Sequence, residues 1–323
     1  MTSEWINTKQ VSIKKATQKA EAYYKVLSDI DDPEYESALS ELNELTQSVL
    51  SKPIGDASDF HNFAVGLAKN EFDHLACEVL RCGLRLFPQN CDLLSDFLHY
   101  GMNCGLQDEC KLYYEALKKL PKRLYTWRGF TFGIYYLEAL LDQCDTDSKL
   151  DELANEMLQL SNDFLKYLPY EEDAYRSRAT IYNVLKDPQK EIDTLRDGLK
   201  HLQSAPKCAL ELADILVDRG EYDEALSVIS RCISDNNKDQ SSINEAYVYY
   251  LWGRARLGKE EKSGGEFTKD IVIPIYVDFN TALSTLKNNS YINVIHEKVK
   301  LLQSKTGINV PMALENLYDL IEN

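Results

Sequence analysis

Two helix patterns on either side of a glycine-containing turn, over residues 209–232, constrain the fold of this chain most. Apolar residues recur every three or four positions before and after the tripeptide Gly220-Glu221-Tyr222, and this is the periodicity of amphipathic helices. Small residues lie where the two helices would touch, with Ala213 in the first and Ala225 in the second. Because small side chains let two helix axes approach closely, the stretch is predicted to form a helical hairpin.

One distance within this hairpin recurs along the chain. Ala213 lies nineteen residues before Cys232, and the same separation joins Val26 to Leu45, Ala64 to Gly83, Phe97 to Ala116 and Ala179 to Gly198. In one of these pairs the bulky Phe97 takes the place of a small residue, so we expect the two helices of that hairpin to lie further apart. The recurrence predicts an array of similar hairpins.

Two further hairpins contain visible insertions. Thr131 and Phe164 are thirty-three residues apart around a polar segment at 142–148, and Gly253 and Ala282 are twenty-nine apart around a glycine-rich loop at 262–266. Beyond them, residues 291–305 and 311–321 are predicted to form two helices without the motif. A terminal unit of a repeat array needs a polar outer face, so we interpret this pair as a cap whose inner side is formed by Leu301, Leu302, Leu314, Leu317 and Leu320.

The pattern resembles that of the tetratricopeptide repeat (TPR) family, whose period is 34 residues. Residues 220–225 match the turn between the two helices of that repeat closely. The resemblance implies an all-α fold, a right-handed α-solenoid of stacked antiparallel helix pairs, with about seven repeat hairpins and a C-terminal capping pair. We expect one continuous superhelix, with an N-terminal hairpin at 1–54, a central array at 55–258, and a final hairpin with its insertion and cap at 259–323.

The resemblance also implies that the first helix of each hairpin lines a concave groove, which binds an extended peptide or a partner helix. Family members that hold the C-terminal carboxylate of chaperones use a clamp of lysine and asparagine. This chain departs from that clamp, with His61, Asn62 and Val65 in one hairpin, Arg176, Ser177 and Thr180 in another, and Leu210, Glu211 and Asp214 in a third.

Tyrosine and arginine dominate binding hot spots, because each combines a large contact area with hydrogen bonding. The residues that we expect to face the groove lie on three first helices: Arg128, Phe132, Tyr135, Arg176, Thr180, Asn183, Tyr247, Tyr250 and Arg254. Since tyrosines also fill the core of such repeats, we expect only part of this set to contact a partner.

Composition and charge narrow the function classes. The net charge of −16 argues against a protein that binds duplex nucleic acid, which needs a basic face. The basic run from Lys118 to Arg123 is interpreted as a helix C-terminus whose lysines complement the helix dipole. Eight cysteines without a CxxC pair, no secretory signal at the start and no apolar run of about 20 residues predict a cytoplasmic protein with reduced, mostly buried thiols and no membrane association.

Motifs that carry chemistry are missing from the sequence. It contains no glycine-rich phosphate-binding motif, and the calcium-like start at Asp145 has Leu150 where glycine is needed. His74 and Cys77 are one helical turn apart but lack the further ligands of a zinc site. We therefore expect no metal, no cofactor and no enzyme activity.

The leading hypothesis is a protein-binding scaffold or adaptor. The alternatives are a peptide-responsive regulatory TPR sensor that changes conformation on binding and an enzyme whose site spans several hairpins, and the oligomeric state is left open.

Overall fold

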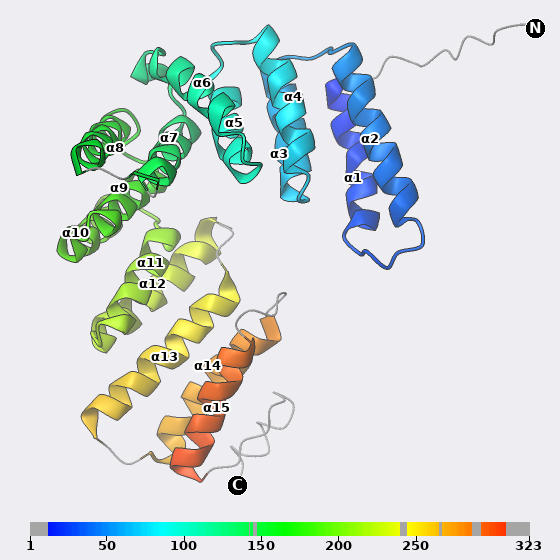
Figure 1. Cartoon of the computed structure of the whole chain (residues 1–323). Helices are drawn as coiled ribbons and strands as arrows, with labels where there is room; N and C mark the ends of the chain where they lie inside the picture. Colours follow the sequence, from blue (N-terminus) through cyan, green and yellow to red (C-terminus); the bar gives the residue numbers. More distant parts are fainter. Residues whose placement is uncertain are drawn as a thin grey trace, which may run out of the picture. The chain divides into compact units, whose positions relative to one another are not determined.

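The structure, a computed structural model, describes residues 12–141, 143–144, 147–239, 244–264, 267–285 and 292–307 (Figure 1). In these ranges every regular element is a helix and no strand occurs, which confirms the all-α prediction. The predicted helix at 311–321 lies outside the described residues. The elements are α1 (Ile13–Leu27), α2 (Tyr35–Ser51), α3 (Ala57–Lys69), α4 (Asp73–Leu86), α5 (Cys91–Asn103), α6 (Gln107–Lys118), the 3-10 helix η1 (Lys122–Leu124), α7 (Trp127–Leu141), α8 (Asp147–Tyr167), α9 (Glu172–Val184), α10 (Pro188–His201), α11 (Pro206–Asp218), α12 (Tyr222–Asp239), α13 (Glu245–Ser263), α14 (Lys269–Thr285) and α15 (Ile292–Thr306).

Consecutive helices pair into hairpins where the sequence predicts them. Contacts join α1 to α2, α3 to α4, α5 to α6, α7 to α8, α11 to α12 and α13 to α14. Neighbouring hairpins stack through their first helices, since α3 contacts α1 and α5, α5 contacts α7, and α11 contacts α13. This is the architecture of a helical-repeat solenoid.

The chain divides into two compact units, Met1–Ser177 and Arg178–Asn323, with the boundary inside α9. We call them unit 1 and unit 2. The predicted subdivision at residues 54/55 and 258/259 remains a prediction.

Four hairpins close with the same backbone turn. After α11, the N–H of Gly220 donates to the carbonyl of Val217 (3.1 Å) and that of Glu221 donates to the carbonyl of Leu216 (2.9 Å), a Schellman motif. The equivalent bonds follow α3, α5 and α9. The residue with positive φ in these turns is Glu71 (69°), Gly105 (72°), Lys186 (56°) or Gly220 (73°). Within each unit the two turns are 34 residues apart, so the TPR period is visible in the backbone.

The predicted small residues lie in the interfaces between helices. Ala213, Ala225 and Cys232 are fully buried, and the Cys232 thiol donates to the carbonyl of Pro206, 3.2 Å away in the paired helix. These small side chains therefore let the two helices approach closely, as the spacing predicts.

The hairpin of α5 and α6 was expected to be wider because of Phe97, and this expectation is wrong. Gly101, one turn along α5, provides the close approach instead: a Cβ at this position would lie 2.7 Å from Sγ of Cys110. Phe97 is fully buried beside this contact, and its ring packs edge-on to Tyr113 of α6 with 4.5 Å between centroids. A glycine one turn away thus compensates for the bulky residue.

The C-terminal part of unit 2 is described as far as α15, which packs on α14. Leu302 is buried as predicted, whereas Leu301 is 40% exposed, because adjacent residues lie about 100° apart around a helix. Leu314, Leu317 and Leu320 lie outside the described residues.

All eight cysteines are free and six of them are buried. Among the described helices, none combines the length and the apolar character that crossing a membrane requires.

Candidate functional site

In unit 1, the predicted binding residues of α7 form one cluster. The guanidinium of Arg128 lies over the ring of Trp127, 4.6 Å from its centroid, and 5.9 Å from the centroid of Phe132. The rings of Phe132 and Tyr135 are 6.3 Å apart. Phe132 is only 8% exposed and Tyr135 is 37% exposed. Phe132 therefore supports the cluster from below, and Tyr135 presents it to solvent.

A buried carboxylate joins this cluster to the first helices of two other hairpins. Asp96 of α5 is fully buried. One of its oxygens lies 2.5 Å from Nδ1 of His61 in α3, and the other accepts a hydrogen bond from Arg128 in α7 (3.2 Å). Two partly exposed groups thus compensate one buried charge, as a buried carboxylate requires. We call His61, Asp96 and Arg128 the Asp96 network.

His99, one turn beyond Asp96, extends the aromatic surface. Its ring stacks on Phe132 with 4.4 Å between centroids and an interplanar angle of 4°. Burial lowers the pKa of His99 from its ordinary value, although the nearby carboxylates of Asp73 and Asp96 oppose the shift. The imidazole is therefore neutral near pH 7 and packs as a flat aromatic ring.

Sequence reasoning missed the Asp96 network and His99. The separations of 35 residues from His61 to Asp96 and 32 from Asp96 to Arg128 are close to the repeat period, so equivalent positions on successive first helices were the available signal. A search for polar residues at that interval would have found it.

The three predicted residues of α9 lie at a spacing that places them on one helix face. Arg176, in unit 1, donates to the carboxylate of Asp173, one turn earlier (2.7 Å). Asn183, in unit 2, donates to Glu191 at the start of α10 (3.0 Å). Thr180 is partly buried.

In unit 2, the predicted residues of α13 are tied into the fold. Arg254 donates to Asp218 of α11 (2.7 Å) and lies 3.6 Å from Asp214 of the same helix. Its guanidinium also lies 5.5 Å from the ring centroid of Tyr250. Tyr250 is 7% exposed and packs in the core against Phe279 of α14. Tyr250 is thus a packing residue, with Tyr247 5.9 Å from it at the edge of this core.

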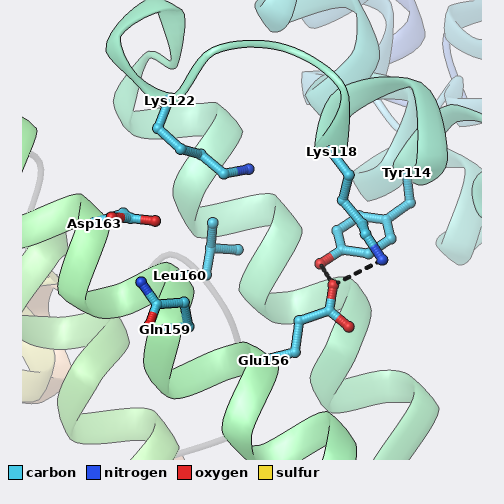
Figure 2. Close-up of a pocket in the computed structure, with 7 residues that line it drawn as sticks. All are labelled: Tyr114, Lys118, Lys122, Glu156, Gln159, Leu160 and Asp163. Carbon is cyan, nitrogen blue, oxygen red and sulfur yellow. Dashed lines mark hydrogen bonds and ion pairs between the residues drawn. The ribbon is translucent and has the colours of Figure 1, made fainter.

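A pocket of about 260 Å³, which the sequence did not predict, lies between α6, η1 and α8 (Figure 2). Its lining consists of Tyr114, Lys118, Lys122, Glu156, Gln159, Leu160 and Asp163. The hydroxyl of Tyr114 donates to Glu156 (2.9 Å), and the amine of Lys118 lies 3.2 Å from the same carboxylate oxygen.

The basic run at Lys118–Arg123 supplies one side of this pocket. Lys118 is in the last turn of α6, as the helix-dipole interpretation predicts. Lys122 lies beyond α6, in η1, and its amine points into the pocket (Figure 2). The interpretation therefore holds for the first part of the run and is wrong for Lys122.

The surroundings of the proposed zinc ligands are visible in the described ranges. No three His, Cys, Asp or Glu side chains there come together as metal ligands would. At Cys77, the thiol considered as a zinc ligand, burial raises the pKa well above its ordinary value, and the neighbouring Cys104 adds to the shift. A protonated, buried thiol is a poor ligand and a poor nucleophile.

Comparisons with known proteins agree with this geometry at the level of the fold. No protein-family model matches the sequence, and no curated protein matches it. A TPR protein from Parabacteroides merdae ATCC 43184 is similar in structure, with a TM-score of 0.51, 14% identity, and coverage of 90% of this chain and 99% of that one. The thermophilic TPR protein TTC0263 of Thermus thermophilus has a TM-score of 0.49 and 18% identity, over 62% of this chain and 99% of that one.

A third similar structure is the APC/C hetero-tetramer Cut9-Hcn1. It has a TM-score of 0.50 and 15% identity, and the match covers 88% of this chain and 53% of that one. This chain therefore corresponds to about half the length of that protein. Together with the hairpins and their shared turn, the similarities to the Parabacteroides merdae protein and to Cut9-Hcn1 show that the chain has a TPR-like helical-repeat fold.

Proposed function

We propose that this chain is a non-enzymatic scaffold or adaptor, which binds an extended peptide or a helix of another protein along the face of its first helices. It acts in the cytoplasm without a cofactor or metal, and its partner is a protein rather than nucleic acid or membrane. The observation that carries the proposal is the Asp96 network, which holds Arg128 against the rings of Trp127 and Phe132, next to the exposed ring of Tyr135.

Two properties of this surface favour binding. It combines the side-chain types that dominate hot spots, namely tryptophan, arginine and tyrosine. It is also held in place before any partner arrives, and binding therefore costs less side-chain entropy. Helical-repeat proteins commonly use such surfaces for protein partners, and the Cut9-Hcn1 structure is itself a complex of proteins.

Affinity capture from a native cell extract with the full chain tests this proposal. Tyr135→Ala removes the exposed ring of the cluster and is expected to weaken capture of the partner at least about tenfold, a typical hot-spot effect. Tyr167→Ala is the matched control, because Tyr167 is 40% exposed and lies on the second helix α8. Retention of every partner by Tyr135→Ala and by Arg176→Ala would refute binding by this face.

The alternative is a regulatory sensor that changes conformation when it binds a peptide. Small-angle scattering of the full chain with and without a short peptide from the captured partner tests it. A sensor that closes would give a smaller radius of gyration with the peptide, whereas an unchanged profile would leave only the scaffold.

A further inference from the structure

The pocket between α6, η1 and α8 contains two opposite charges that are not paired with each other. The amine of Lys122 donates to the hydroxyl of Tyr125. The carboxylate of Asp163 makes no hydrogen bond or ion pair within the part of the chain that the structure describes. Neither charge has an ion-pair partner among the described residues, so each can pair with an opposite charge of a ligand.

The Lys122 amine is held at one side of the pocket by its neighbours. Tyr125 accepts its hydrogen bond and in turn donates to the carbonyl of Leu117 (2.6 Å), which fixes the phenol. An ammonium has three N–H donors, and Tyr125 uses one of them. Burial lowers the pKa of Lys122, while the charge of Asp163 opposes the shift. An anion beside this amine would therefore restore the stabilisation that burial removes.

The opposite side of the pocket is already neutralised. Glu156 accepts a hydrogen bond from Tyr114 and pairs with Lys118, which also lies 3.3 Å from Glu115. Figure 2 shows the side chain of Leu160 between Glu156, with its two partners, and the charged groups of Lys122 and Asp163. The groups left for a ligand are thus an ammonium, a carboxylate, the amide of Gln159 and an apolar wall formed by Leu160 and the ring of Tyr114.

Charge and size together define the ligand class. The two lysines and two acids of the lining balance, and this balance disfavours polyanions such as nucleotides. The volume of about 260 Å³ exceeds the ~150 Å³ of a cavity that binds benzene and falls short of the ~300–1,000 Å³ of pockets for drug-sized ligands. A compact ligand with one negative and one positive group fits both limits.

We propose that this pocket binds a free α-amino acid with an apolar side chain. Its carboxylate accepts hydrogen bonds from Lys122, its ammonium donates to Asp163 and to the amide oxygen of Gln159, and its side chain packs on Leu160. The site is separate from the surface of first helices discussed above, so either proposal can fail without the other.

Isothermal titration calorimetry of the full chain with each of the twenty standard L-amino acids tests this assignment. We expect at least one apolar amino acid to bind with a Kd of about 1 mM or tighter. The N-acetyl derivative, which lacks the ammonium, and the carboxamide, which lacks the carboxylate, should each bind at least about tenfold more weakly. The assignment is overturned if no amino acid binds, or if both derivatives bind as well as the parent.

Substitutions locate the site. Lys122→Met and Asp163→Asn should each weaken binding of the amino acid about tenfold or more. Asp163→Asn should change the residual affinity for the N-acetyl derivative much less than the affinity for the free amino acid, because that derivative has no ammonium to pair with Asp163. The matched control is Lys119→Met, which removes the same charge from an exposed position outside the lining. If Lys119→Met weakens binding as much as Lys122→Met, the effect is general electrostatics and the proposed site is refuted.

Discussion

The predicted binding residues of α7 and α13 are of similar types but have different roles in the structure. Each set consists of one arginine and two aromatic residues at helical spacing, and each helix is the first of its hairpin. On α7, Arg128 reaches a carboxylate that is fully buried, Asp96. On α13, Arg254 reaches Asp218, whose side chain is 65% exposed. We therefore expect the fold to depend more on Arg128 than on Arg254, because the acidic partner of Arg128 is buried.

The aromatic residues show the same dependence on their surroundings. Phe132 of α7 and Tyr250 of α13 are both nearly buried. Phe132, however, supports an exposed neighbour, Tyr135, whereas Tyr250 continues into a core that includes Phe279. A surface able to bind a partner is therefore best supported on α7, and the predictions below test how far the two helices differ.

The largest difference in stability is expected between the variants Arg128→Met and Arg254→Met. Loss of Arg128 leaves Asp96 buried with only His61 as a partner, so the free energy of unfolding should fall by roughly 2–3 kcal/mol. Loss of Arg254 breaks a pair with an exposed acid and should cost less than about 1 kcal/mol. Urea unfolding followed by circular dichroism measures both.

A double variant controls for lost packing. Replacing both partners, Arg128→Met with Asp96→Leu, removes the buried charge and should recover part of the stability lost in the single variant. Equal losses in the two single arginine variants would show that burial of the carboxylate does not separate α7 from α13.

Glycines on the two helices provide the next test. A Cβ at Gly258 of α13 would lie 2.3 Å from the ring of Tyr222, whereas one at Gly133 of α7 would lie 3.1 Å from the end of Leu160. Gly258→Ala should therefore destabilise the chain by about 1–3 kcal/mol, because an aromatic ring must move. For Gly133→Ala, the leucine can yield, and alanine favours a helix by about 0.5–1 kcal/mol over glycine, so the net change should be near zero.

Thermal unfolding monitored by circular dichroism distinguishes the two glycine variants. Both are compared with the natural chain in the same buffer, so that only the contact at the glycine differs. A loss in Gly133→Ala as large as that in Gly258→Ala would mean that Leu160 is as rigid as the Tyr222 ring, which would also limit the ligands that the nearby pocket accepts.

The fold was largely predictable from the sequence because its repeated elements are local. The spacing from Ala213 to Cys232 and its repeats marked the hairpins, since a helix–turn–helix of fixed length returns the same contact at the same interval. The close approach at Gly101 was not predicted because it lies outside the nineteen-residue spacing, which pairs Phe97 with Ala116.

The candidate site was less predictable because it depends on neighbours from other hairpins. Arg128 and Arg254 look alike in sequence, and only the structure shows the different burial of their acidic partners. The pocket at Lys122 depends on the path of the chain after α6, where η1 turns the lysine toward α8. Neither feature follows from helical periodicity alone.

Buried carboxylates extend the comparison to pH. Asp96 has two cationic or titratable partners, whereas Asp278, which faces α13, has Arg256 at 3.2 Å. Burial raises the pKa of Asp278 to about 7, with Arg256 opposing the shift. Because the pKa in the folded state is above the ordinary value, the stability contributed by this group is fully present below about pH 4 and is lost as the pH rises through 7.

Asp278→Asn should remove this dependence. The difference in free energy of unfolding between the variant and the natural chain is expected to rise in favour of the variant by on the order of 1 kcal/mol from pH 5 to pH 8. Melting temperatures at the two pH values measure the gain, and Asp270→Asn, an exposed position on α14, is the control. Parallel pH profiles for Asp278→Asn and the natural chain would contradict the assigned role of burial.

The smallest effect concerns the turns, in which the two units are alike. Unit 1 has Glu71 and Gly105 at the positive-φ position, and unit 2 has Lys186 and Gly220. In this conformation a residue with a Cβ is destabilised by about 1–2 kcal/mol relative to glycine. Glycine relieves this strain, but its larger conformational entropy in the unfolded state offsets part of the stabilisation. Glu71→Gly and Lys186→Gly should therefore each raise the free energy of unfolding by about 0.5–1 kcal/mol. If only one of them does so in urea unfolding, the shared backbone turn is not energetically equivalent in the two units, and the difference between the units extends from side chains to the main chain.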